Sequence, residues 1–137
     1  VRMNYQKKYY KYKNKYMNMK KKLGGSENIY TVTVKEPWFS FIKQGEKKIE
    51  GRLNRGLFRK INKGDIVVWI NRDQKVKVRI TDKKVYKSFR EMIEKEGLDK
   101  VLTSIKTISD GVNVYRQYFI EMDEMSNGVV AIIMDVI

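Results

Sequence analysis

The chain has 137 residues, a length that suits one compact domain with a short extension. It carries 30 Lys and Arg against 16 Asp and Glu, a formal net charge of +14, and it contains no His and no Cys. The two missing residue types exclude disulfides, Cys/His zinc sites, Ser-His-Asp triads and histidine general bases. Any catalysis must use Lys, Arg, Tyr, Asp, Glu, Ser or Thr, or a metal held by oxygen ligands.

The first 25 residues form a basic, tyrosine-rich segment, which we expect to be a disordered or partly helical tail before a domain over residues 26–137. The segment holds nine Lys and Arg, no acid and five of the nine tyrosines, and it closes with Gly24-Gly25-Ser26. Lysines neutralise phosphates and tyrosine rings stack on bases, so this composition suits contact with single-stranded nucleic acid. Three alternatives remain open: a merely solubilising tail, an acidic protein partner, or an anionic membrane surface.

Residues 29–70 read as strands joined by turns and one short helix. The β-branched run 29–34 predicts a strand, and Pro37 opens a helix that ends at Gln44-Gly45. Residues 47–53 predict a short strand with a charged face. A turn at 62–65 then leads into residues 66–70, an apolar run that we expect to be a buried strand.

Residues 75–80 alternate strictly between apolar and basic side chains, which predicts one strand of a hairpin after a turn at Arg72-Asp73. Val85-Tyr86 could extend the pairing. The inward positions are Val76, Val78 and Ile80, and the outward ones are Lys75, Lys77 and Arg79. This basic stripe suits phosphate contact, although a solvated strand face would look the same.

The second half reads mainly as helices. Ser88 with Glu91 three residues later predicts a capped helix over 89–96 that ends at Gly97. Further helices are expected over 98–106 and 112–122, and a turn over 126–128. Residues 129–137 form an apolar strand that should lie centrally in the sheet. The order β-α-β-β-β-α-α-α-β predicts an α+β fold, a small, strongly bent mixed sheet or open β-barrel with helices packed over its ends.

The segment from Gly45 to Arg52 concentrates the chemistry. Strand alternation places Lys48, Glu50 and Arg52 on one face, and a bend near Gly45 could bring Lys47 back beside Glu50. One acid among three cations would line a cationic cleft, where the carboxylate could read a base edge or steer a water molecule. A solvated strand face with mixed charges is the alternative interpretation.

Four pieces of the chain, in order, resemble the ASCH domain family, a PUA-like group of small RNA-associated β-barrel domains. They are Pro37-Trp38-Phe39, then Gly45-x-Lys47-x-x-Glu50-x-Arg52, then Lys63-Gly64-Asp65 with the apolar strand to Asn71, and last the sequence from Val85 to Met92 with Tyr115-x-x-Tyr118-Phe119 and residues 128–132. The resemblance covers about residues 29–136. It implies a PUA-like fold, a cleft around the signature, and a function in RNA metabolism.

Some members of the family bind RNA, one branch hydrolyses the acetyl amide of N4-acetylcytidine, and another is reported to cleave RNA. The hydrolase branch uses a Lys, a Thr three residues later and a distal Glu. Lys47 matches the Lys, Glu50 stands at the Thr position, and Glu94 or, as we prefer, Glu96 would be the distal acid. Because a carboxylate cannot simply replace a nucleophilic hydroxyl, we prefer Glu50 as an acceptor for a base amino group. The alternative is a hydrolase in which Glu50 orients water and Lys47 acts as electrophile or proton shuttle.

The expected partner is therefore RNA, either single-stranded or a modified nucleoside, without a metal or cofactor. Trp38 could be core or a stacking platform, Trp69 should be core, and of Tyr115 and Tyr118 one should be core and the other line the cleft. Asn71 could contact a ligand or cap a turn. The residues expected to contact nucleic acid are Trp38, Lys47, Lys48, Glu50, Arg52, Asn71, Lys75, Lys77, Arg79 and Tyr118. No apolar stretch reaches the roughly 18 residues of a membrane span and no secretory signal is visible, so we expect a cytoplasmic or nuclear location.

Overall fold

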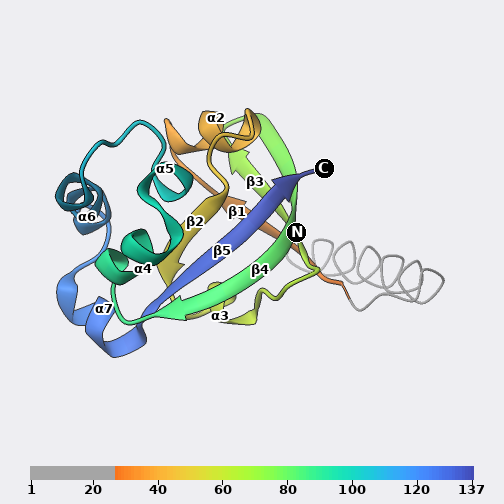
Figure 1. Ribbon diagram of the computed structural model, residues 1–137. Coiled ribbons are helices and arrows are strands. Elements are labelled where there is room, and N and C mark those ends of the chain that lie inside the picture. Colours follow the sequence, from red (N-terminus) through yellow and green to blue (C-terminus); the bar gives the residue numbers. More distant parts are fainter. Residues whose placement is uncertain (1–26) are drawn as a thin grey trace.

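The computed structural model describes residues 27–137, so the predicted tail over residues 1–25 lies outside the described part. Five strands and six helices follow one another within the described residues (Figure 1). They are β1 (Ile29–Thr33), α2 (Trp38–Lys43), β2 (Ile49–Leu53), α3 (Leu57–Lys60), β3 (Ile66–Asn71), β4 (Gln74–Tyr86), α4 (Phe89–Glu96), α5 (Leu98–Val101), α6 (Ile108–Arg116), α7 (Glu121–Asn127) and β5 (Val129–Val136).

The strands form one mixed sheet in the order β1-β3-β4-β5-β2, in which only the β1–β3 pair is parallel. β4 and β5 are long and bend together, with a register irregularity between Ile80 and Asp82 (Figure 1). The sheet is thereby curved into a half-barrel whose two edge strands, β1 and β2, lie at its open side. The expected α+β fold with a strongly bent mixed sheet is confirmed.

β5 is buried on both faces from Val129 to Met134, which explains why its sequence is nearly all apolar. Val130, Ile132 and Met134 face the inside of the curve, where they pack with Trp69. Val129 and Ala131 face the other way, toward the helices. β5 lies between β4 and β2, in the interior of the sheet as predicted, and only its end, from Asp135 onward, is exposed.

The hairpin prediction also holds. Asn71 pairs with Gln74 across the turn at Arg72-Asp73, and the apolar positions of β4 are buried while Lys75 and Lys77 are exposed. β4 then continues to Tyr86, where it pairs with β5 and no longer with β3. The sequence prediction had ended this strand at Ile80 and left the extension open.

The helices differ more from the expectation, since only α2 and α4 were predicted close to their observed bounds. Helix α4 is capped by Ser88, whose Oγ accepts a hydrogen bond from the Glu91 amide at 3.0 Å. The helix predicted over 98–106 is only α5, and the one predicted over 112–122 is two helices, because Thr107 caps an earlier start and the chain turns at Tyr118. The turn expected over 126–128 is largely the end of α7, and α3 was not predicted.

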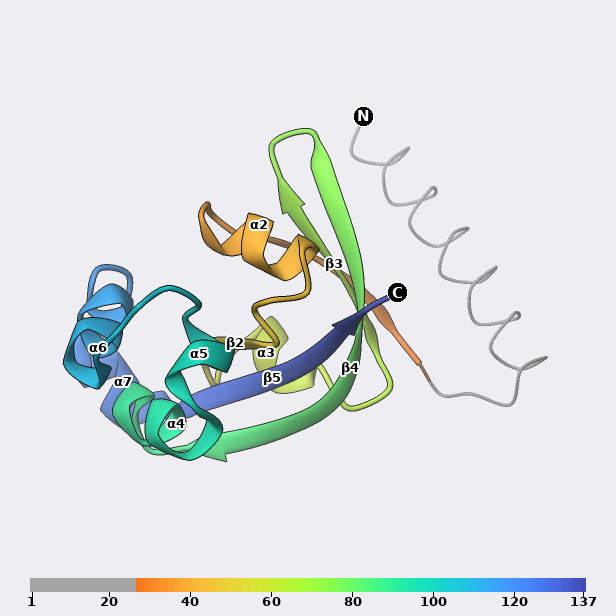
Figure 2. The same ribbon diagram turned by 45° about the horizontal axis from the view of Figure 1, so that its top comes forward.

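Helices α4 to α7 gather on one side of the sheet, while α2 covers the open end of the curve (Figure 2). None of the helices in residues 27–137 is both long and apolar enough to cross a membrane. This arrangement leaves the open side of the half-barrel between α2 and α6, next to the edge strand β2.

Candidate functional site

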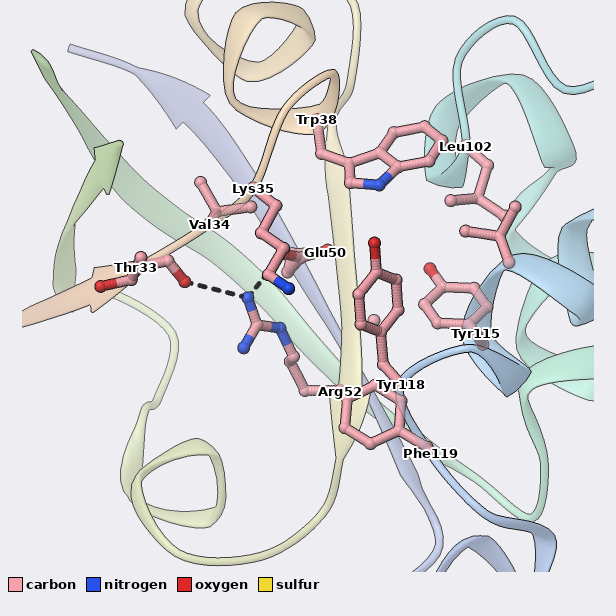
Figure 3. Close-up of a pocket in the computed structure, with 12 residues that line it drawn as sticks. Thr33, Val34, Lys35, Trp38, Glu50, Arg52, Leu102, Tyr115, Tyr118 and Phe119 are labelled. Atoms are coloured by element: carbon pink, nitrogen blue, oxygen red, sulfur yellow. Dashed lines mark hydrogen bonds and ion pairs between the residues drawn. The ribbon is translucent and has the colours of Figure 1, made fainter. Parts of the chain in front are cut away.

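A pocket of about 360 Å³ lies at the open side of the half-barrel (Figure 3). One wall is the end of β1 and the residues after it, from Thr33 to Lys35. The floor is β2, from Glu50 to Arg52. The remaining lining residues come from α2, α5 and the α6 region, and they are Trp38, Leu102, Val114, Tyr115, Tyr118 and Phe119. The pocket thus combines a charged strand with aromatic and aliphatic walls.

Arg52 connects the two edge strands across this opening. Its Nη2 lies 3.2 Å from Oε2 of Glu50 and donates to the carbonyl oxygen of Thr33 at 3.3 Å. The guanidinium also stands over the rings of Phe58 and Trp69, with centroids 4.9 and 5.8 Å from Cζ. The arginine is therefore held in a fixed position, with its charge facing the carboxylate of Glu50.

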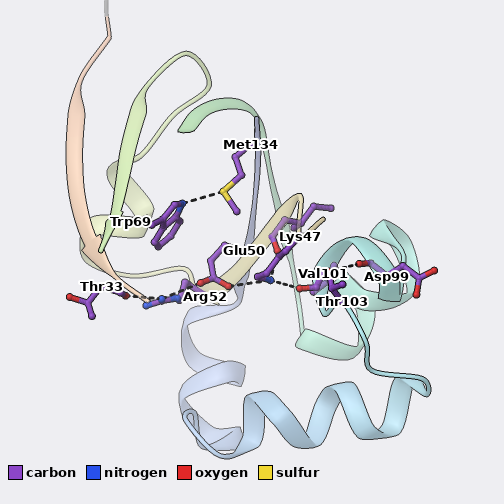
Figure 4. A network of polar contacts seen from close by, with 10 residues as sticks. Thr33, Lys47, Glu50, Arg52, Trp69, Asp99, Val101, Thr103 and Met134 are labelled. Atoms are coloured by element: carbon purple, nitrogen blue, oxygen red, sulfur yellow. Dashed lines mark hydrogen bonds and ion pairs between the residues drawn. The ribbon is translucent and has the colours of Figure 1, made fainter. Parts of the chain in front are cut away.

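Lys47 contacts Glu50 and the end of α5 (Figure 4). Gly45, at φ +79°, turns the chain after α2, and this bend brings the Nζ of Lys47 to 3.5 Å from Oε1 of Glu50. Nζ donates to the carbonyl oxygen of Ile49 at 2.5 Å and to that of Val101. Burial lowers the pKa of Lys47, and the charge of Glu50 opposes this effect. Lys47 is only 2% exposed and is not among the pocket-lining residues.

The aromatic walls have an open and a buried part. Tyr118 is 47% exposed, and the Nζ of Lys35 lies 5.3 Å from its ring centroid. Trp38 is half-buried at the mouth. Tyr115 is 4% exposed, and its ring stacks on Phe89 with centroids 4.1 Å apart. Trp69 is fully buried, as predicted, and Tyr115 is the core member of the tyrosine pair.

Several residues expected to contact nucleic acid lie elsewhere. Lys48 is exposed and lies 3.8 Å from Asp135, beside a separate hollow that also contains Glu96. Glu96 accepts a hydrogen bond from Tyr86, and burial together with this bond raises the pKa of Tyr86 to about 12. Glu96 is therefore not brought together with Lys47 and Glu50.

The remaining four residues lie on the β3–β4 hairpin. Asn71 donates to the carbonyl oxygen of Val34 at 2.9 Å, a structural role of the capping kind. Lys75 and Lys77 are exposed on β4, and Arg79 pairs with Glu27 at 2.6 Å. Of the ten residues expected to contact nucleic acid, the structure places Trp38, Glu50, Arg52 and Tyr118 in the pocket.

Gly51 is a pocket residue whose importance sequence reasoning missed. A Cβ atom at this position would lie 2.8 Å from the hydroxyl of Tyr115 and 2.5 Å from Cε of Met92. Only a residue without a side chain lets Tyr115 approach the strand so closely. A glycine inside a strand is a known sign of close approach, but the sequence does not say what approaches it.

The site offers hydrogen-bonding and stacking groups without a metal-binding cluster. Within residues 27–137, no group of three or more acidic side chains could hold a metal ion. A carboxylate fixed between two cations accepts hydrogen bonds, and the rings around it present flat apolar faces. Such a pocket suits a planar, polar-edged ligand.

The comparisons with known proteins show the family and the fold. The model of the ASCH domain family matches residues 32–135. A solved structure of the hypothetical protein PH0355 is 43% identical, with a TM-score of 0.76, and covers 80% of this chain and 100% of its own. The solution structure of PF0455 from Pyrococcus furiosus is 41% identical, with a TM-score of 0.69, and covers 80% and 98%.

A third structure, EF3133 from Enterococcus faecalis V583, is only 7% identical, with a TM-score of 0.58 over 91% of each chain, and shows a likeness of fold alone. A search of curated proteins finds no match. The fold is thus the expected PUA-like arrangement.

Proposed function

This chain belongs to the ASCH domain family, and we propose that it binds RNA by holding a single nucleobase, unmodified or modified, in the pocket between β1 and β2. The family is PUA-like and is thought to bind RNA, which makes RNA the first ligand to consider. The basic tail would add affinity for the phosphates on either side of that base.

The observation that carries this proposal is the ion pair of Glu50 and Arg52 beneath aromatic walls. Trp38, Tyr118 and Phe119 offer ring faces on which a base can stack, while Glu50 offers an acceptor for its edge. A volume of about 360 Å³ is at the small end of ligand sites and suits one base rather than a longer segment. Lys35 at the mouth could meet the phosphate next to that base.

A hydrolase that uses Lys47 and Glu50 is the second candidate, and the lowered pKa of the buried Lys47 is the observation in its favour. Two facts weigh against it. The Nζ hydrogens of Lys47 are used by Ile49, Val101 and Glu50, and the side chain does not line the pocket. Acetate release from N4-acetylcytidine by the unsubstituted protein, but not by Lys47→Ala, would replace the binding proposal with this one.

The binding proposal can be tested at Tyr118, because this exposed side chain can be changed without disturbing the core. Affinity of the full chain for fluorescein-labelled single-stranded RNA is measured by fluorescence anisotropy. We expect Tyr118→Ala to weaken binding about tenfold, the loss typical of one stacking ring. The matched control is Met125→Ala, since Met125 is 79% exposed and outside the pocket. Equal affinities of both variants and the unsubstituted protein would overturn the proposal.

A further inference from the structure

The hydroxyl of Tyr115 is a buried polar group without a partner. It is the one buried side-chain nitrogen or oxygen in residues 27–137 that makes no hydrogen bond. Buried hydroxyls are nearly always hydrogen-bonded, because an unpaired one loses its water without compensation. This hydroxyl belongs to a residue that lines the pocket, so the missing partner can come from a ligand.

The fold holds this hydroxyl in a defined position. The ring of Tyr115 stacks on Phe89 with an interplanar angle of 10°, and the absence of a side chain at Gly51 leaves the hydroxyl room against β2. The backbone of Gly51 lies close enough to the oxygen to lower the pKa of Tyr115, against the larger effect of burial, but the two groups do not meet the distance and angle of a hydrogen bond. The phenol is therefore fixed beside the strand that carries Glu50 and Arg52 (Figure 3).

The main chain of Gly51 also faces this space. On the side of β2 that faces β5, the carbonyl oxygen of Lys48 accepts a hydrogen bond from the amide of Met134. The amide of Asn54 donates to the carbonyl oxygen of Gly128. Backbone groups of an antiparallel strand alternate in direction, so the amide and carbonyl of Gly51 point away from β5, toward the open side. Polar main-chain groups, the Tyr115 hydroxyl and the Glu50 carboxylate thus surround the same end of the pocket.

The hydroxyl is suited to donate rather than to react. Burial raises the pKa of Tyr115 well above its ordinary value, and the negative charge of Glu50 acts in the same direction. The phenol therefore keeps its proton at neutral pH and has one hydrogen to give. Glu50, held by Lys47 and Arg52, can accept a hydrogen bond beside it.

We propose that the Tyr115 hydroxyl donates a hydrogen bond to an acceptor atom on the edge of the bound base. The neighbouring N–H group of the same edge donates a hydrogen bond to the carboxylate of Glu50. This inference rests on the proposed function and adds a specificity-determining residue to it. The ligand class is a flat ring with an N–H beside a ring nitrogen or carbonyl oxygen, the amidine or amide edge of a nucleobase. The comparison of the four bases described below identifies which base presents this donor–acceptor edge to the pocket.

The test compares Tyr115→Phe with Tyr86→Phe, two variants that each lose one hydroxyl and keep the ring, the second outside the pocket. Binding of the full-length proteins to labelled single-stranded RNA hexamers of each of the four bases is measured at about 0.15 M salt, where non-specific attraction is screened. We expect Tyr115→Phe to bind the preferred hexamer about tenfold more weakly and to lose most of the preference among bases. Tyr86→Phe, whose lost hydroxyl donates to Glu96 outside the pocket, should keep both affinity and preference.

The stability of the same variants separates a ligand contact from a structural one. If the hydroxyl served the fold, Tyr115→Phe would lower the melting temperature; we expect it to be unchanged or raised, since an unpaired buried group is removed. Unchanged affinity and preference in Tyr115→Phe would overturn this inference alone. A failure of the unsubstituted protein to bind any hexamer would overturn the proposed function, and the inference with it.

Discussion

The Nζ of Lys47 lies 3.5 Å from Oε1 of Glu50, and both side chains are almost completely buried. Two buried charges stabilise each other only as long as both are present, because each has lost its hydration. Glu50 has a second cationic partner in Arg52, whereas Lys47 is also bound to two carbonyl oxygens of the main chain. The lysine therefore fixes β2 to the end of α5 and holds the carboxylate at the pocket.

Removing the charge of Lys47 should be costly for the fold. We expect Lys47→Met to reduce the free energy of unfolding by roughly 3 kcal/mol, the range seen when one partner of a buried ion pair is removed. The control is Lys48→Met, whose partner Asp135 is exposed and whose loss should cost less than about 1 kcal/mol. Urea denaturation followed by circular dichroism measures both. Equal stability of the two variants would show that the buried pair contributes no more than a surface one.

Gly51 and Tyr115 should be coupled energetically. In Gly51→Ala the new methyl group overlaps with the Tyr115 hydroxyl and with Met92, so we expect a loss of roughly 1–3 kcal/mol of stability. Part of this loss, on the order of 0.5–1 kcal/mol, should disappear in a Tyr115→Phe background, since one of the two overlaps is relieved. A Tyr118→Phe background should give no relief. Chemical denaturation of the four proteins completes the cycle, and strict additivity would contradict the close approach.

The fold was predictable where the information is local. The alternation of residues 75–80, the apolar run of β5 and the cap at Ser88 each depend on a few neighbouring residues, and each was found as expected. The bend at Gly45 likewise placed Lys47 beside Glu50. The single turn α3 could not be predicted, because it has no capping side chain and no buried residue.

The site was predictable only in part, because it depends on contacts between distant segments. Glu50 and Arg52 could be placed on one strand, but the pocket is completed by Thr33 and by Tyr115, which lies more than 60 residues further along the chain. The basic stripe of Lys75, Lys77 and Arg79 was expected to contact nucleic acid, and it lies outside the pocket. The alternation of side chains along a strand predicts which residues share a face. It does not predict which other segments of the chain pack against that face.

Tyr115 should also affect the pH dependence of stability. Its folded-state pKa is raised, so above pH about 10 the unfolded chain loses a proton that the folded protein keeps. The contribution is fully present below that pH and is lost as the pH rises further. We expect the stability of the unsubstituted protein to fall more steeply than that of Tyr115→Phe, by up to about 1.4 kcal/mol per pH unit. Urea midpoints at pH 8, 10 and 11 measure the difference, and parallel curves would contradict it.

The tail and the pocket should contribute to RNA binding in different ways. The nine basic residues of the tail can neutralise phosphates, and each phosphate contact to single-stranded RNA adds roughly 0.7 to the slope of log affinity against log salt. Deleting residues 1–25 should therefore reduce the slope by at least about 2, the value for three such contacts. Tyr118→Ala should lower affinity at every salt concentration and leave the slope unchanged, because stacking releases no counterions.

The double variant Lys75→Gln/Lys77→Gln is the matched control for charge outside the tail. If the hairpin also meets phosphates, the slope should fall by about 1.4 for the two lysines, and if the hairpin is only a solvated face the slope should not change. Anisotropy titrations of one RNA decamer between about 0.05 and 0.3 M salt compare all four proteins on one scale. An unchanged slope after deletion of the tail would contradict its role in RNA binding. If deletion of the tail reduces the salt slope, and Tyr118→Ala lowers affinity without changing that slope, then the tail and the pocket contribute to binding of the same RNA independently.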